Sequence, residues 1–132
     1  MRRANWPAGT KKFMLETKSA QIRLDTLMAT QKANCGHTGA CMSVVEILVA
    51  LYYGKINGRS VVNFDVTKPG SDSQDYVILS KTSAALVQYA ILADLGFFDK
   101  SELNYFGSSG SLLPSYPLSK VPGISVSVLG DG

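Results

Sequence analysis

The fold class follows from residues 76–96, YVILSKTSAALVQYAILADLG. Residues 76–79 form a short apolar run after a polar connection, which is typical of a strand buried on both faces. Residues 80–83 then turn the chain into a predicted helix from Ala84 to Leu95, and Gly96 is expected to end it. A buried strand that leads directly into a helix is the basic unit of an α/β fold.

A long helix is predicted on the N-terminal side of this unit, from Glu16 to Asn34. Apolar residues recur there at helical spacing, and Gly36 is expected to end the helix. The expected core face comprises Ile22, Leu24, Leu27 and Met28, and the expected solvent face comprises Arg23, Asp25 and Lys32. Residues 1–16 carry Pro7, Gly9 and two basic pairs, so they are predicted to form an N-terminal arm before a domain at 17–132.

A second helix is predicted to begin at Ser43, because Ser43-x-x-Glu46 matches a capping box. The residues that follow leave almost no polar face, so this helix is expected to be buried. Residues 54–75 are polar and are predicted to form a long surface connection.

The C-terminal part contains fewer regular elements. Asp99 is expected to cap a short helix through Phe106, residues 107–123 form a predicted loop, and residues 124–129 form a second predicted strand. The sequence therefore indicates an α/β fold, with a parallel sheet flanked by helices. Two strands are few for an independent sheet.

Composition narrows the class of protein. With 132 residues, 45% hydrophobic and 17% charged, the chain fits one globular domain. Its net charge of +3 lacks the clustered basic stripe of a nucleic-acid-binding protein, so no nucleic-acid partner is expected. The longest apolar stretch, residues 44–53, is too short for a membrane span, and no signal-peptide pattern opens the chain. Cys35 and Cys41 match neither a redox pair nor a zinc site, which favours a cytoplasmic protein with reduced thiols.

Four motifs follow one another in the same order as in the N-terminal section of the transketolase family. Together they resemble a divergent and truncated form of that section. The first lies between two helices, where Cys35-Gly36-His37-Thr38-Gly39 is similar to Ser-Gly-His-Pro-Gly. The others are Tyr76-Val77-Ile78-Leu79-Ser80-Lys81, Gly96-Phe97-Phe98 with Glu102-Leu103, and Pro122-Gly123-Ile124. The resemblance covers residues 20–126 and implies a partial thiamine-diphosphate-binding fold.

The resemblance also implies thiamine diphosphate and Mg²⁺ as cofactors, the metal being held by the Asp of a Gly-Asp-Gly motif and by a later Asn. Asp131 is the candidate metal ligand, and Gly130 and Gly132 are candidate cofactor-binding residues. Alternatively, residues 129–132 are a degenerate copy of the family's Leu-Gly-Gln-Gly cofactor loop. A further alternative is that Asp131 is only a polar residue at the end of a strand. The Asn partner does not occur in this sequence, so the site needs residues from elsewhere.

The family uses three histidines for contacts with substrate and diphosphate, and this chain retains one. His37 matches the first, and the resemblance assigns it a catalytic role. Thr82-Ser83 replaces the second, where hydroxyls can still donate hydrogen bonds to a phosphate. Tyr116 replaces the third and is a candidate substrate-binding residue, or a loop aromatic that packs on the core.

Two functions from different classes are consistent with these residues. The first is one chain of a transketolase-like enzyme that transfers a two-carbon ketol unit and requires a partner chain with the pyrimidine-binding domain, as a dimer or heterotetramer. Loss of two histidines then implies an altered donor or acceptor. The second is a non-catalytic interaction module, whose open strand edge and apolar helix faces a partner covers. A third possibility is a fragment of a longer protein.

Overall fold

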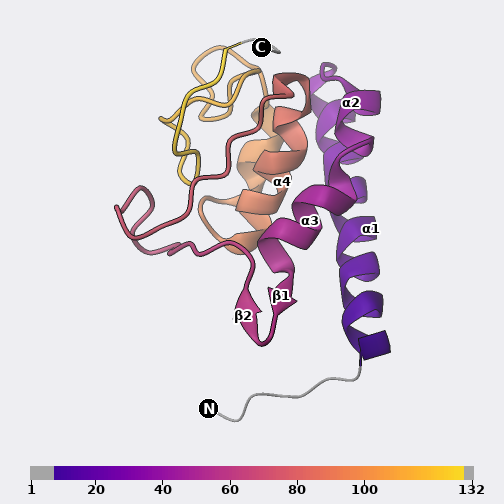
Figure 1. The fold of residues 1–132 in the computed structure, drawn as a ribbon. Helices are drawn as coiled ribbons and strands as arrows, with labels where there is room; N and C mark the ends of the chain where they lie inside the picture. The colour runs from indigo at the N-terminus through magenta and orange to yellow at the C-terminus, as the bar shows by residue number, and fades with distance from the viewer. Residues whose placement is uncertain (1–7, 130–132) are drawn as a thin grey trace.

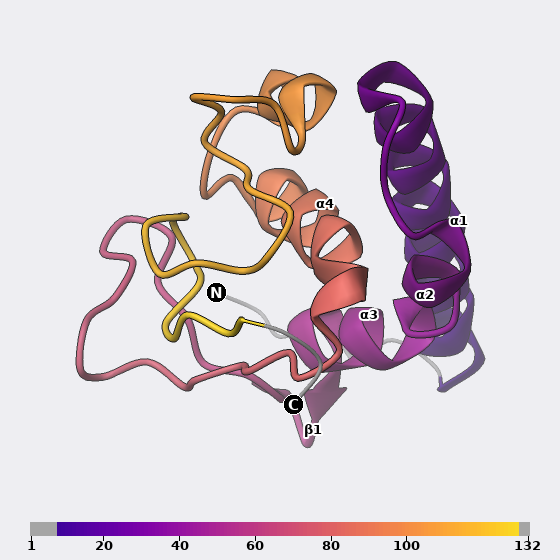
Figure 2. The same cartoon turned by 90° about the horizontal axis from the view of Figure 1, so that it is seen from above.

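Three helices pack against one another, and long irregular segments cover the far side of the central helix (Figures 1 and 2). The computed structural model describes residues 8–129. Its elements are α1 (Ala8–Ala33), α2 (Thr38–Met42), α3 (Val45–Tyr53), β1 (Lys55–Ile56), β2 (Arg59–Ser60), the 3₁₀ helix η1 (Thr82–Ala84), α4 (Ala85–Leu95) and the 3₁₀ helix η2 (Lys100–Tyr105).

Helix α4 is the centre of the core, as its sequence predicts. Every residue from Ala85 to Ala93 is buried, because a helix that is apolar on all sides must be covered on all sides. Gly96 ends the helix in the left-handed conformation, with a φ of 92°, and its N–H group donates to the Ala93 and Leu92 carbonyls. The predicted helix and its end are confirmed.

The predicted parallel sheet is wrong for the part of the chain that the structure describes. The sheet found there has two strands, β1 and β2, paired antiparallel around Asn57 and Gly58. Both turn residues have positive φ, as a tight Asn-Gly hairpin requires. Residues 76–79 and 124–129 form no strand and no backbone ladder among the described residues.

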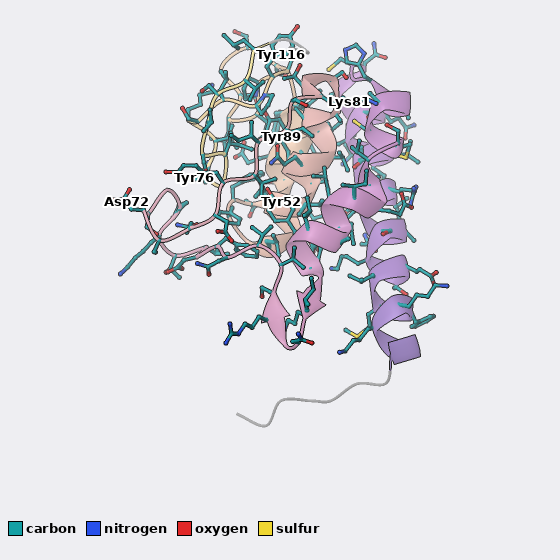
Figure 3. The ribbon with its side chains drawn as sticks, in the orientation of Figure 1. Tyr52, Asp72, Tyr76, Lys81, Tyr89 and Tyr116 are labelled. Atoms are coloured by element: carbon teal, nitrogen blue, oxygen red, sulfur yellow. The ribbon has the colours of Figure 1, made fainter. Side chains whose placement is uncertain are left out.

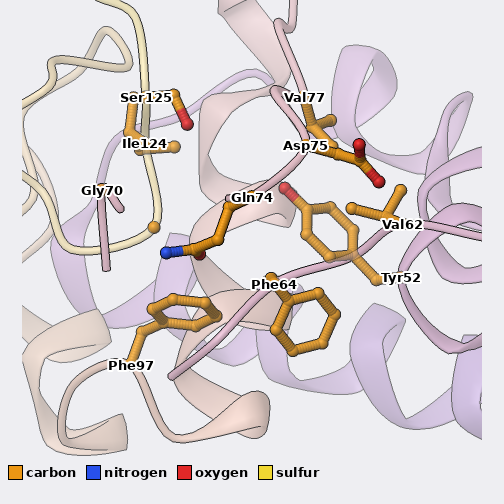
Figure 4. Close-up of a pocket in the computed structure, with 11 residues that line it drawn as sticks. Tyr52, Val62, Phe64, Gly70, Gln74, Asp75, Val77, Phe97, Ile124 and Ser125 are labelled. Carbon is orange, nitrogen blue, oxygen red and sulfur yellow. The ribbon is translucent and has the colours of Figure 1, made fainter. Parts of the chain in front are cut away.

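The reason is that the described residues cover these segments on one side only. Val77 packs against the core, whereas Tyr76 and Ile78 are 62% and 56% exposed. Val77 and Ile124 line the same cavity, whose volume of about 20 Å³ suits a single water (Figure 4). A parallel sheet needs cover on both faces, and the described residues supply it on one.

Helix α1 faces the core with the opposite side from the one predicted. Leu24, Leu27 and Met28 are 52%, 44% and 48% exposed, while Asp25 is buried. Of the expected core face, only Ile22 is buried. The residues that pack inward are mostly small, namely Ser19, Ile22, Thr26 and Ala29. Small side chains let the α1 backbone approach α3 and α4, which the apolar pattern alone does not reveal.

Hydrogen bonds within α1 and one ion pair to η2 involve two of the polar side chains on this inward face, Thr26 and Asp25. Thr26 Oγ1 donates to the Ile22 carbonyl over 2.8 Å, a back-bond within the helix that permits its burial. Asp25 Oδ1 accepts from Gln21 Nε2 over 3.0 Å, and its Oδ2 lies 2.8 Å from Lys100 Nζ. Burial of the Asp25 carboxylate is therefore tolerated because a cation from η2 accompanies it.

Both ends of helix α1 differ from the predicted boundaries. Helix α1 begins at Ala8, eight residues before Glu16, so the segment expected as an arm is helical from Ala8 onward. It ends at Ala33, and Asn34 has a φ of 50°. The division into an arm and a domain at residue 16 stays a prediction.

The predicted capping box does not form. Helix α3 begins at Val45, its N-cap Val44 makes no side-chain cap hydrogen bond, and Ser43 Oγ donates to the Ala40 carbonyl. Glu46 instead pairs with Arg23 on α1, and this hydrogen bond holds the pKa of Glu46 below its usual range. By contrast, the predicted cap at Asp99 is confirmed, since its side chain accepts from the Ser101 N–H group over 2.8 Å.

A three-residue polar cluster joins the three main helices. Asp94 Oδ2 on α4 accepts from Lys18 Nζ of α1 over 2.8 Å and from the Tyr53 hydroxyl of α3 over 2.5 Å. Burial opposes ionisation of Asp94, but these two hydrogen bonds outweigh it and hold its pKa below the usual range. Burial and the Asp94 hydrogen bond raise the pKa of Tyr53, so it remains a donor.

Asp94→Asn is expected to lower the free energy of unfolding by about 2 kcal/mol at pH 7, since hydrogen bonds to a charged group are the strong ones. A depressed pKa in the folded state contributes stability above the unfolded pKa of about 3.9, and this contribution is lost as the pH falls through the folded value. Urea titrations at several pH values should therefore show the two proteins converging below about pH 4. The exposed pair Lys12–Glu16 supplies the control, because Glu16→Gln should change little. A constant difference at every pH would contradict this account.

Candidate functional site

The start of α2 lies beside η1 at one end of the molecule, and the loop that carries Tyr116 reaches the same end (Figure 3). His37 immediately precedes α2, and its carbonyl accepts the Cys41 N–H group over 3.0 Å. The His37 side chain is exposed. The backbone of His37 therefore begins the helix while its imidazole is accessible from solvent.

The predicted cofactor residues Thr82 and Ser83 lie in η1, which packs against α2. Thr82 is buried and Ser83 is half-buried. The Cys41 thiol of α2 donates a long hydrogen bond of 3.9 Å to the Ser83 carbonyl. Burial raises the pKa of Cys41, so this thiol stays protonated and serves as a packing residue. The structure thus brings Thr82 and Ser83 together with the helix that His37 begins.

A lysine at this end could not be assigned from the sequence. Lys81 Nζ donates to Ser43 Oγ over 2.8 Å, which joins the residue before η1 to the residue after α2. Lys81 is exposed, so its ammonium remains accessible to an anion. The only sequence signal was its position in the Ser80-Lys81 motif, directly before Thr82 and Ser83.

Tyr116 is held through its backbone rather than through its ring. The Tyr89 hydroxyl of α4 lies 2.9 Å from the Pro114 carbonyl and 2.8 Å from the Tyr116 carbonyl, so its single proton is shared between these two acceptors. Burial raises the pKa of Tyr89, so the donor proton is retained. The Tyr116 side chain is 48% exposed, which disfavours its interpretation as a packed core aromatic.

The last described residues lie beside this loop. The Val128 N–H group donates to the Pro117 carbonyl over 2.9 Å, and the Ser119 N–H group donates to Ser127 Oγ over 2.8 Å. Gly130, Asp131 and Gly132 lie outside the described residues. Their predicted roles in cofactor and metal binding stay predictions.

The donor set at this end suits an anion better than a metal ion. Between residues 8 and 129, no group of three His, Cys, Asp or Glu side chains could hold a metal. Lys81 offers an exposed ammonium that donates to Ser43 Oγ over 2.8 Å and has further N–H donors, and such a group pairs with phosphate oxygens. Within the same range, no helix combines the length and hydropathy that a membrane crossing requires.

Comparison with known proteins agrees with the motifs. Residues 15–132 match the family model described as transketolase, thiamine diphosphate binding domain. The chain is 30% identical over 120 residues to a protein of Phocaeicola vulgatus named as an apulose-4-phosphate transketolase subunit, which covers 89% of this chain and 41% of that protein. It is 31% identical over 121 residues to the 6-deoxy-6-sulfo-D-fructose transketolase subunit SqwG of a Clostridium species, covering 89% and 42%.

A full-length transketolase is also similar. The chain is 27% identical over 128 residues to mouse transketolase, covering 96% of this chain and 20% of that protein. The chain thus spans less than half the length of the curated relatives it matches. Because the family match extends from α1 to residue 132, the chain belongs to the transketolase family and matches its thiamine-diphosphate-binding domain.

Proposed function

We propose that this chain is the thiamine-diphosphate-binding part of a transketolase-like transferase that moves a two-carbon ketol unit and works with a chain carrying the pyrimidine-binding domain. The observation that supports this most is the grouping of η1, Lys81 and the start of α2 in a chain that matches the cofactor-binding family. Two relatives with similar coverage are named as subunits, which supports a separate partner chain.

The residues at this end have distinct proposed tasks. Lys81 supplies a positive charge for the diphosphate, and Thr82 and Ser83 supply hydrogen bonds from η1. Gly130 and Gly132 allow close backbone approach, and Asp131 holds Mg²⁺ together with a ligand from elsewhere. When bound, the cofactor supplies the carbanion stabilisation that ketol transfer requires. The chain itself orients the sugar through His37 and Tyr116.

The sugar is proposed to differ from the common substrates of the family. Ser83 and Tyr116 stand where the family has histidines, so two imidazoles that can donate, accept and carry a proton are replaced by hydroxyls. The relatives named for apulose 4-phosphate and for 6-deoxy-6-sulfo-D-fructose make such sugars the first to assay.

The alternative function, a non-catalytic interaction module, is favoured by a different observation. Large apolar side chains are exposed on α1 and on the extended segment at 76–79, including Leu24, Leu27, Tyr76 and Ile78. Such surface is usually covered by a partner, whether or not the pair performs catalysis. Measuring whether thiamine diphosphate binds distinguishes the two proposed functions, because only the enzyme subunit is expected to bind it.

Calorimetric titration with thiamine diphosphate and Mg²⁺ tests the proposal. We expect binding when the chain is mixed with a transketolase-type pyrimidine-binding chain from the same genome, and much weaker binding by either chain alone. Asp131→Asn in the mixture should weaken the Mg²⁺-dependent part of binding by about tenfold or more, because one charged metal ligand is lost. Unchanged affinity for thiamine diphosphate would favour the alternative that residues 129–132 are a degenerate copy of the Leu-Gly-Gln-Gly loop. No binding in any mixture would favour the interaction module.

A further inference from the structure

A buried hydroxyl ties the loop that carries Tyr116 to the helical core. Tyr89 of α4 is fully buried, and its hydroxyl lies 2.9 Å from the Pro114 carbonyl and 2.8 Å from the Tyr116 carbonyl (Figure 3). A proton shared in this way holds two carbonyls on either side of Ser115 at once. Residues 111–119 form no helix or strand, so contacts of this kind determine the shape of the loop.

The loop turns outward between two buried residues. Leu113 and Pro117 are buried, whereas Tyr116 between them is exposed. The Pro117 carbonyl accepts the Val128 N–H group over 2.9 Å, and this donor belongs to an irregular segment itself. The Tyr89 hydroxyl comes instead from a helix, so it holds the exposed tip of the loop in place relative to the core.

Helix α4 also continues the element that carries the predicted cofactor residues. It follows η1 without a break. Tyr89 stands six positions after Ser83, about 9 Å along the helix axis. Every residue from Ala85 to Ala93 is buried, and such a fully packed helix is among the parts of a protein that open least. One rigid helix therefore sets the separation between η1 and the Tyr116 loop.

The Tyr89 ring has a packing role that is separate from that of the hydroxyl. Its centroid lies 6.1 Å from that of Phe106, at an interplanar angle of 58°. Tilted aromatic pairs at this distance stabilise a core. Because Tyr89→Phe keeps the ring and removes only the hydroxyl, the two roles can be measured separately.

We propose that Tyr89 is a positioning residue for the sugar, because its hydroxyl holds Tyr116 at a fixed place relative to η1. The inference rests on the proposed function, in which Tyr116 contacts the sugar and η1 contacts the diphosphate. Without the hydroxyl, the carbonyls of residues 114 and 116 lose their shared donor and the tip of the loop relaxes. A displacement of about 1 Å is enough to weaken a contact with a reacting substrate. The residues of η1 keep their place, since they are joined to α4 through the backbone.

Amide hydrogen exchange of the chain alone tests the anchor without any substrate. Tyr89→Phe should speed exchange of the amides between residues 111 and 119 about 2- to 10-fold, the factor that corresponds to one neutral hydrogen bond. The amides of residues 85–93 should keep their rates. Tyr105→Phe, which removes the hydroxyl of a tyrosine that is 59% exposed, is the matched control and should change neither segment. Unchanged exchange in the loop of the Tyr89→Phe chain would overturn the proposal.

Kinetics of the complex with the pyrimidine-binding chain test the effect on the sugar. The probes are apulose 4-phosphate and 6-deoxy-6-sulfo-D-fructose, for which two relatives are named. Tyr89→Phe should raise KM about 2- to 10-fold and leave the Kd of thiamine diphosphate within about twofold. In a chain that already carries Tyr116→Ala, Tyr89→Phe should no longer change KM, although its effect on the urea unfolding midpoint stays the same. A purely structural role would not produce this difference between the two backgrounds.

The outcomes also separate this inference from the proposed function. An unchanged KM after Tyr89→Phe, or a rise by the same factor in both backgrounds, would overturn the positioning role and leave the proposed function intact. A Kd for thiamine diphosphate that rises as much as KM would overturn it too, since Tyr89 would then support the whole site. No turnover of either sugar by the unaltered complex would overturn the positioning role, and no binding of thiamine diphosphate by that complex would overturn the proposed function as well.

Discussion

Gly123→Ala is expected to lower the free energy of unfolding by about 2–4 kcal/mol, because two penalties act at one position. Gly123 has a φ of 94°, a conformation that an L-residue with a Cβ adopts at a cost of about 1 kcal/mol. A Cβ there would also lie 2.6 Å from Leu92 Cδ2 and 3.2 Å from Phe97 Cδ1. Leu92 is fully buried in α4, so it has little room to move away.

Gly70→Ala is the matched control, since Gly70 has a φ of 85° and no described atom lies within 4 Å of the position that a Cβ would take. It should show the backbone penalty alone, about 1 kcal/mol. Urea unfolding of both variants therefore isolates the steric contribution. The double variant Gly123→Ala with Leu92→Ala should recover part of that contribution, because the Cδ atoms in contact are removed. Equal destabilisation at residues 70 and 123 would show that Leu92 and Phe97 do not restrict this site.

This result would explain in structural terms why the Pro122-Gly123-Ile124 motif has glycine at its centre. The glycine lets the chain pass close to the C-terminal half of α4, and Ile124 then enters the core. The same passage directs the segment at 124–129 toward Pro117 and the Tyr116 loop. A motif that indicates ancestry thus also determines how residues 124–129 approach the Tyr116 loop.

The elements that the sequence predicted correctly are those whose signals are local. Helix α4 is apolar on every side, Gly96 takes the left-handed conformation that ends it, and the Asp99 side chain binds a backbone N–H group two residues away. Each of these depends on residues within a few positions of one another, so no knowledge of the tertiary fold was needed.

The predictions that were wrong concern which face of a helix or strand is covered by other parts of the chain. The pattern of Leu24, Leu27 and Met28 correctly shows that these residues share a face of α1, but it does not show whether the described residues cover that face. The segment at 76–79 failed as a strand for the same reason, since Tyr76 and Ile78 are left largely uncovered by the described residues. Periodicity identifies an apolar face, whereas packing decides which face is inside.

The residues of the candidate site also fall into two groups, those that the sequence predicted and those that it did not. The motifs located His37, Thr82, Ser83 and Tyr116 as residues of one family pattern. The contacts of Lys81 with Ser43 and of Tyr89 with the loop at 114–116 join positions more than 20 residues apart, and a single sequence contains no signal for such pairs. The helices and η1 had to be placed before these residues could be recognised.

His37→Ala is expected to lower turnover of the complex with the pyrimidine-binding chain by about 10²–10⁴-fold, the range that a positioned acid or base contributes. Its effect on stability should stay within about 0.5 kcal/mol, because the side chain is exposed. The contact that begins α2 uses the His37 carbonyl, which alanine retains. Turnover is measured with the sugars named for the two subunit-type relatives, and stability by urea unfolding.

Gln31→Ala, at an exposed position on the last turns of α1, is the control and should change neither quantity. Thiamine diphosphate affinity measured on the same samples adds a second criterion. If His37 acts on the sugar, cofactor affinity should stay within a few-fold of the unaltered complex while turnover falls. Parallel losses of turnover and stability would make His37 structural, and unchanged turnover would remove the chemical role that the motif gives it. Because the chain has no second imidazole to substitute for the first, this one substitution distinguishes a catalytic chain from a partner that only binds.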